Sequence, residues 1–142
     1  MPPRPFLLDT NVLVHLSRQN ETGKRINEQF KLTSNWASSL ISVVTVAEML
    51  VFASKWGKEK RGRMEQMLGD LVTVDIGHRD ILERFAEIKV GSKGLTLGDN
   101  DLWIAATASV TDAILLTCDK DFIPLDGQYL QCIWIDPRAP NA

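Results

Sequence analysis

Short apolar runs alternate with longer amphipathic segments along this chain. The apolar or β-branched runs, which are typical of strands buried in a sheet, cover residues 6–8, 40–44, 71–76, 113–117 and 132–135. Between them, apolar positions recur at helical spacing in segments that begin near residues 11, 21, 45, 64, 80 and 99. Strands that alternate with helices predict an α/β fold of three layers, with a mostly parallel central sheet covered by helices on both faces.

Capping and turn signals predict where several of these segments begin and end. Thr10 or Asn11 is expected to cap the first helix, and the second helix is expected to run over residues 21–36. Thr45 is expected to open the helix after the second strand. The glycines within residues 55–63 are expected to interrupt the helix in which they lie.

Composition limits the chain to the globular class. Its 142 residues are 44% hydrophobic and 24% charged, so we expect one domain over residues 1–142, with the motif-bearing region from about 6 to 135. The net charge of -2 argues against a globally basic nucleic-acid binder. Cys118 and Cys132 lie outside any zinc-binding spacing and indicate buried thiols in a reducing compartment. With no long apolar segment or signal pattern, we expect a cytoplasmic protein without a membrane partner.

Four acidic residues lie where a predicted strand ends or a predicted helix begins. They are Asp9, Glu48, Asp101 and Asp119, and in a parallel sheet these positions share the carboxyl-terminal edge. Each acid alone has a simpler explanation, because carboxylates cap helix N-termini, and Thr45 with Glu48 matches a capping box. Together they favour a shared site.

Carboxylates packed in one crevice repel one another unless a cation binds or some of them hold protons. Oxygen ligands without thiolate or imidazole favour Mg²⁺ or Mn²⁺ over zinc. Two such ions can activate water and stabilise the leaving oxygen of a phosphodiester, as in nucleases. The acids therefore predict metal-assisted chemistry on an anionic substrate.

The motifs around these acids resemble those of the PIN domain, most of all the small VapC-type proteins. The matching segments read LLDTNVL from Leu7, SVVTVAEML from Ser42, NDLWIAATA from Asn100 and LLTCDKDF from Leu115. The resemblance implies a three-layer PIN-like fold and a metal-dependent endoribonuclease whose Mg²⁺ or Mn²⁺ ions are held by Asp9, Glu48, Asp101 and Asp119. It assigns supporting roles to Thr10, Asn11, Thr117 and Asp121.

The resemblance also implies a biological setting. A VapC-type protein is expected to be the toxin of a toxin–antitoxin pair, neutralised by a small antitoxin whose tail occludes the acidic crevice. It is expected to form a homodimer and to leave 5′-phosphate and 3′-hydroxyl ends on RNA.

The most basic stretch of the chain is a second candidate contact with RNA. Its cations, which suit a phosphate backbone but equally suit a solvated helix face, are Lys55, Lys58, Lys60, Arg61 and Arg63. Trp56 beside them is placed to stack on a base, whereas Trp36, Trp103 and Trp134 are interpreted as core or interface packing. His15 and His78 are interpreted as surface or packing residues, since the metal mechanism needs neither.

Two other functions fit parts of the pattern. An aspartate-based phosphatase of the haloacid dehalogenase kind would have a second Asp two positions after the first, where this chain has Asn11. A non-catalytic RNA- or protein-binding module with the same fold is the stronger alternative. The target RNA and the number of metal ions do not follow from the sequence.

Overall fold

The computed structural model describes residues 4–138, apart from the side chains of residues 35–37, and has a five-stranded sheet at its centre. The strand order is β3-β2-β1-β4-β5, and every neighbouring pair is parallel. The strands are β1 (Phe6–Leu8), β2 (Leu40–Ser42), β3 (Val72–Val74), β4 (Ile114–Thr117) and β5 (Gln131–Trp134). The predicted α/β fold with a parallel sheet is therefore confirmed.

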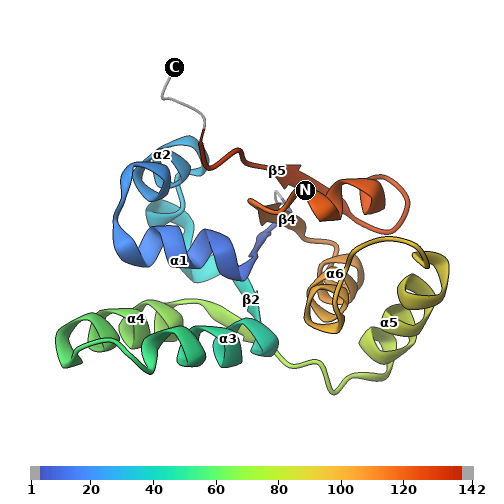
Figure 1. Ribbon diagram of the computed structural model, residues 1–142, viewed down its shortest axis with the longest axis horizontal. Helices are drawn as coiled ribbons and strands as arrows, with labels where there is room; N and C mark the ends of the chain where they lie inside the picture. The colour runs from blue at the N-terminus through green and yellow to red at the C-terminus, as the bar shows by residue number, and fades with distance from the viewer. Residues whose placement is uncertain (1–3, 139–142) are drawn as a thin grey trace.

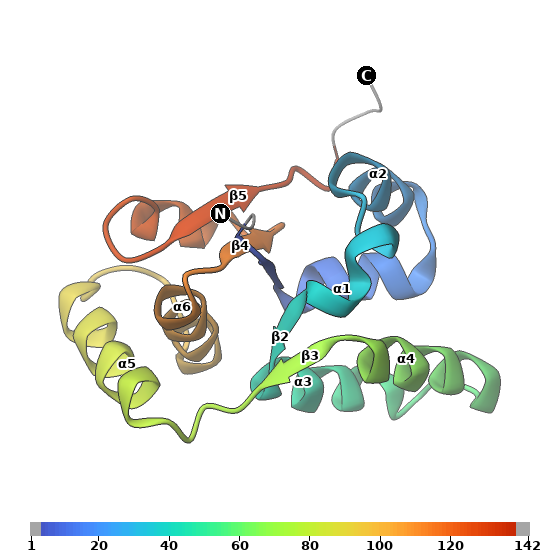
Figure 2. The same cartoon turned by 180° about the vertical axis from the view of Figure 1, so that it is seen from behind.

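Helices cover both faces of this sheet. Helices α1 (Thr10–Arg18), α2 (Glu21–Phe30), α3 (Val43–Ala53) and α4 (Lys58–Asp70) lie on one side, and α5 (Arg79–Gly91) and α6 (Asp99–Thr111) lie on the other (Figures 1 and 2). Two 3₁₀-helices, η1 (Thr33–Ser38) and η2 (Lys120–Leu125), complete the described elements. No helix in residues 4–138 combines the length and apolar character needed to cross a membrane.

Alternating residues of the strands belong to two separate core clusters. Leu7 and Leu115 belong to the α6-side cluster, which also contains buried residues of α5, α6 and η2. Leu8 and Leu116 belong to the α1-side cluster, with buried residues of α1, α2, α3 and α4. The central strands β1 and β4 are thus buried on both faces, which explains why their sequences are continuous apolar runs.

Three predicted boundaries are wrong for local reasons. The second strand stops at Ser42, whose hydroxyl accepts from the backbone N–H of Val44 at 3.1 Å and caps α3, so Thr45 lies inside the helix. The second helix ends at Phe30 because Lys31 adopts a left-handed conformation with φ 53°. Gly57 precedes α4 as its N-cap, as expected of a boundary, but Gly62 lies within that helix.

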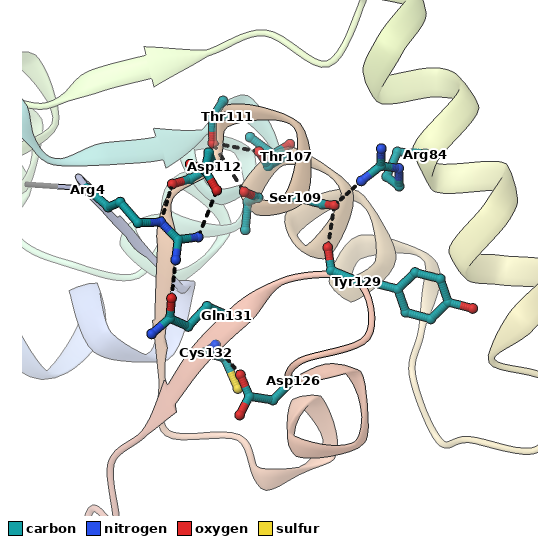
Figure 3. Close-up of polar contacts among 11 residues, drawn as sticks. Arg4, Arg84, Thr107, Ser109, Thr111, Asp112, Asp126, Tyr129, Gln131 and Cys132 are labelled. Atoms are coloured by element: carbon teal, nitrogen blue, oxygen red, sulfur yellow. Dashed lines mark hydrogen bonds and ion pairs between the residues drawn. The ribbon is translucent and has the colours of Figure 1, made fainter. Parts of the chain in front are cut away.

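Arg4 links several elements at the amino-terminal edge of the sheet (Figure 3). Its Nε donates to the carbonyl of Asp112 at 2.9 Å, and its Nη2 pairs with the carboxylate of the same residue at 2.9 Å. The guanidinium also donates to Gln131 of β5. Because Asp112 ends α6 in a left-handed conformation, these contacts tie that helix end to β5 at the edge opposite the four acids.

The contact between α1 and α2 requires a glycine at position 23. A Cβ there would lie 2.2 Å from the carbonyl oxygen of His15, a backbone atom that cannot turn aside. We expect Gly23→Ala to lower the free energy of unfolding by about 2 kcal/mol, measured by urea denaturation. Gly62→Ala is the matched control, since its Cβ would meet nothing within 4 Å and the better helix former should stabilise α4. Equal or higher stability of Gly23→Ala would contradict the close approach.

Candidate active site

Asp9 lies at the carboxyl-terminal tip of β1 and is the N-cap of α1, a role expected of Thr10 or Asn11. Its side chain is buried, with 4% exposed, and three donors hold it. The backbone N–H of Thr10 donates to Oδ1 at 2.8 Å, while the Asn11 amide at 3.1 Å and the Thr117 hydroxyl at 2.7 Å donate to Oδ2. These bonds fix the carboxylate in one orientation.

Thr117 joins Asp9 to the acids that follow β4. Its hydroxyl donates to Asp9 and accepts from the backbone N–H of Asp119 at 2.9 Å. Asp119 in turn caps η2, accepting from the backbone N–H of Asp121 at 2.9 Å. The amide of Asn11 contributes a second link, because its oxygen accepts from the N–H of Cys118 at 3.0 Å. The end of β4 is therefore held against the end of β1.

Glu48 reaches the same place from α3. The Thr10 hydroxyl donates to Glu48 Oε1 at 2.7 Å and forms a second hydrogen bond with Thr45 Oγ1 at 3.1 Å. The capping-box interpretation of Thr45 and Glu48 is wrong, since α3 begins at Val43 and Glu48 lies in its second turn. Thr45, absent from the predicted site, is a buried part of it. The signal was its spacing, because residues three apart share a helix face.

Asp101 completes the group from the first turn of α6. The pKa of its carboxyl is raised, mainly by burial and then by the negative charge of Asp119, with smaller contributions from Glu48 and Asp121. The acids Asp9, Glu48, Asp101, Asp119 and Asp121, called the acidic edge below, are thus close enough to influence one another electrostatically.

The buried carboxyl of Asp9 shows how unfavourable this arrangement is for the bare protein. Burial is the largest cause that raises its pKa to about 6, against the hydrogen bonds from Thr117 and Thr10, which lower it. The charges of Asp101 and Glu48 raise it further. Every charged group that shifts the pKa of Asp9 or Asp101 is itself acidic, so no cation among residues 4–138 compensates these charges.

The donors of the acidic edge fit a hard divalent cation, because all are carboxylate oxygens and their repulsion would be relieved by positive charge. These acids do not, however, already form a complete coordination sphere. Within residues 4–138, no three Asp, Glu, His or Cys side chains are already arranged to hold a metal ion. The chemistry of the donors fits such an ion, while a preformed three-ligand cluster is not part of the described structure.

The basic stretch lies away from the acidic edge. Lys58, Lys60, Arg61 and Arg63 belong to α4, and the connection that contains Lys55 lies at the end of α3 distant from the sheet (Figure 1). The Lys60 ammonium sits over the Trp56 ring, 4.3 Å from its centroid. The structure therefore does not bring these predicted RNA contacts together with the acids.

In the described part of the chain, the contacts of the two histidines involve no residue of the acidic edge. His15 Nδ1 forms a hydrogen bond of 3.0 Å with the side-chain amide of Asn20 between α1 and α2. His78 precedes α5 and makes no side-chain cap bond. Neither forms a hydrogen bond with an acid of the edge in the described structure.

Comparison with known proteins identifies the family. The sequence profile of the PIN domain matches residues 6–127. The chain belongs to the PIN domain family. It is 28% identical to Ribonuclease VapC5 of Mycobacterium tuberculosis over 131 residues, which cover 88% of this chain and 90% of the relative.

Solved structures of PIN proteins share the fold. A toxin–antitoxin complex from Klebsiella pneumoniae is 28% identical, with a TM-score of 0.68 over 92% of this chain and 96% of the other. VapBC2 from Rickettsia felis, solved bound to a DNA fragment from its promoter, has 24% identity and a TM-score of 0.74 over 92% of this chain and 98% of the other. The resemblance to VapC-type PIN proteins is therefore confirmed in sequence and in fold.

Proposed function

We propose that this PIN protein is an Mg²⁺- or Mn²⁺-dependent endoribonuclease. The observation that carries the proposal is Asp9, a buried carboxylate held by three donors among other acids, with its pKa raised to about 6. Burying a charge among like charges costs free energy, and a bound cation would relieve that cost. The likeness to Ribonuclease VapC5 supports RNA as the substrate.

Asp9, Glu48, Asp101 and Asp119 would hold the ions, with Asp121 in support. When bound, the ions supply activation of water and stabilisation of the charge that develops on the phosphodiester. The protein's own groups position the carboxylates. Thr10 orients Glu48, and Thr117 orients Asp9 while holding the backbone of Asp119.

We extend the proposal to the protein's partners and place in the cell. The resemblance to a solved toxin–antitoxin complex supports a toxin whose partner is a small antitoxin. The remaining points rest on family likeness: a homodimer in the cytoplasm, made of one PIN domain over residues 1–142.

The proposed activity is tested with end-labelled single-stranded RNA and purified protein. We expect cleavage with Mn²⁺ or Mg²⁺, none with EDTA, and recovery when Mn²⁺ is added back in excess, with 5′-phosphate and 3′-hydroxyl product ends. Cleavage that persists in EDTA would overturn the metal-carboxylate mechanism. RNA binding without cleavage in any metal would favour the non-catalytic binding module.

Thr117 offers a test of the supporting shell. Thr117→Val keeps the shape but removes the donor to Asp9 and the acceptor for the N–H of Asp119. We expect cleavage to fall by about 10- to 100-fold, as for residues that orient metal ligands, and stability to fall by about 2 kcal/mol. Single-turnover cleavage and urea denaturation measure the two effects.

Thr117→Ser is the matched control, because it loses a methyl group and retains the hydroxyl. It should keep most of the activity. If Ser and Val lower cleavage equally, the packing of Thr117 matters and its hydrogen bonds do not.

A further inference from the structure

Trp134 lies in line with the acidic edge. In the parallel pairing of β4 with β5 it stands opposite Thr117, the residue that holds Asp9. Neighbouring strands are about 4.8 Å apart, and paired residues of parallel strands point to the same face of the sheet. Asp9, Thr117 and Trp134 therefore form one row at the ends of three adjacent strands.

Core or interface packing was expected of Trp134 from the sequence, and the core role is wrong. Trp103 packs against the α6-side cluster and Trp56 against the α1-side cluster, whereas Trp134 is among the residues of neither. Its ring is half-buried, and its indole N–H donates to the carbonyl of Cys118 at 3.1 Å. This bond holds a partly exposed aromatic ring beside the end of β4.

Arg25 of α2 brings a positive charge to the same corner. Its Nη2 donates to the carbonyl of Asp136, two residues beyond Trp134, at 2.6 Å. Its charge also lowers the pKa of the Cys118 thiol, which burial, and then Asp9, raise to about 11. The hydrogen bond to Asp136 therefore holds Arg25 at the segment that directly follows β5.

We propose that Trp134 and Arg25 form a nucleotide site at the β4–β5 end of the acidic edge. Trp134 stacks on an unpaired base next to the scissile bond, and Arg25 contacts a phosphate of the same strand. The inference rests on the proposed ribonuclease function and narrows its substrate to single-stranded RNA. A base within a duplex is already stacked and paired, so it cannot lie on the indole.

Physical reasons favour this corner over the basic stretch of α4. A strand that crosses the acids needs positive charge close to them, since its phosphates are repelled by the carboxylates. Arg25 provides positive charge at the segment that follows β5, and guanidinium geometry suits phosphate. The Trp56 ring, in contrast, packs on the α1-side cluster, and Lys60 sits over it.

The test is steady-state cleavage, with Mn²⁺, of a single-stranded oligoribonucleotide that carries one mapped cleavage site. We expect Trp134→Leu to raise KM about tenfold with kcat within threefold, the range of one lost base stack. Trp134→Phe, which lacks the indole N–H and keeps an aromatic face, should keep most of the affinity. Thermal melts of both variants separate lost folding from lost stacking.

Substrates with one base deleted give a readout that a structural role would not move. An abasic residue is placed in turn on each side of the cleavage site. At the stacking position the wild-type KM should rise to the Trp134→Leu value, and Trp134→Leu should show no further rise. Equal effects of Trp134→Leu on intact and both abasic substrates would overturn the stacking contact.

The charge is tested separately with neighbouring residues of α2. Arg25→Gln should raise KM and lower by about one the slope of log KM against log salt, as expected for one lost phosphate contact. Lys24→Gln is the matched control, because Lys24 is exposed and lines the groove with Arg63 and Met64 of α4. If both substitutions change KM and the salt slope equally, the effect comes from net charge, and the proposed contact between Arg25 and a phosphate is contradicted.

Two further outcomes separate this inference from the proposed function. Wild-type cleavage together with an unchanged KM in Trp134→Leu, or a rise in Trp56→Leu instead, overturns the nucleotide site alone. Absence of wild-type cleavage in every metal overturns the ribonuclease proposal, and fluorescence anisotropy of labelled RNA with the same variants then decides whether Trp134 binds it.

Discussion

Asp9→Asn is expected to reduce RNA cleavage by a factor on the order of 10³ or more while the protein stays folded. Asp9 is the acid that the structure holds most firmly, by two donors from α1 and one from β4. A neutral amide in its place has one oxygen instead of two and no negative charge for a metal ion. The chemistry supplied by the ion should fail, although the shape of the site is nearly unchanged.

The measurement is single-turnover cleavage with saturating protein and Mn²⁺, so that weaker RNA binding does not hide the result. Glu28→Gln, which removes an exposed acid of α2, is the charge-matched control and should cleave like the wild type. Circular dichroism of both variants confirms folding. An Asp9→Asn protein with more than a tenth of wild-type activity would place the essential metal ligands elsewhere.

The metal-free protein is expected to lose stability as the pH rises from about 4 to about 6. The pKa of Asp9 is raised from 3.8 to about 6 in the folded state, so folding favours the protonated form. Below about pH 4 the Asp9 carboxyl is protonated in both the folded and the unfolded state, so it does not lower the free energy of unfolding. Above pH 6 it is ionised in both, and the folded state bears a penalty of about 3 kcal/mol.

Asp9→Asn removes this penalty and so isolates it. The raised pKa of Asp101 acts in the same direction in both proteins, and the comparison largely cancels it. The amide has only one acceptor oxygen, so it cannot accept both from the Thr10 N–H and from Asn11 and Thr117, as the two carboxylate oxygens do. This loss lowers the stability of the variant at every pH. Relative to wild type, the variant should therefore gain up to about 3 kcal/mol between pH 4 and pH 8.

Urea denaturation in EDTA at pH 4, 6 and 8 measures this gain, and saturating Mn²⁺ should abolish it by stabilising the wild type at neutral pH. A difference between the two proteins that stays constant with pH would mean that Asp9 titrates normally. A gain of the opposite sign would mean that the folded state stabilises its charge, and Asp9 would then be a structural residue.

Several features of the fold follow from local chemistry and were predicted. The apolar runs of β1 and β4 are continuous, which is typical of strands buried on both faces in a parallel sheet covered by helices. Errors arose where neighbouring signals competed. Val43 and Val44 have strand propensity, yet the hydroxyl of Ser42 caps a helix there, and the cap with its tertiary packing outweighs the weaker preference.

The acids of the site were found from their positions, since strand ends and helix starts of a parallel sheet share one edge. Their hydrogen bonds were not predictable, because Thr10 with Glu48 and Thr117 with Asp9 are separated by 38 and 108 residues in sequence. The position of Trp134 outside both core clusters was not predictable either, because it also depends on residues distant in sequence. An apolar residue type indicates burial on average, and only its neighbours show whether the core contains it.

The sequence by itself determined the order of strands and helices, the edge at which the acids gather, and the family. These depend on periodicity and on residue type, which act over a few positions of the chain. Only the tertiary structure decided which acid is buried, which hydroxyls hold it and which aromatic ring lies beside it. Burial and hydrogen bonding at Asp9 depend on groups from β4 and α1 that meet after folding. The burial raises the pKa of Asp9 to about 6, although the hydrogen bonds from Thr117 and Thr10 lower it.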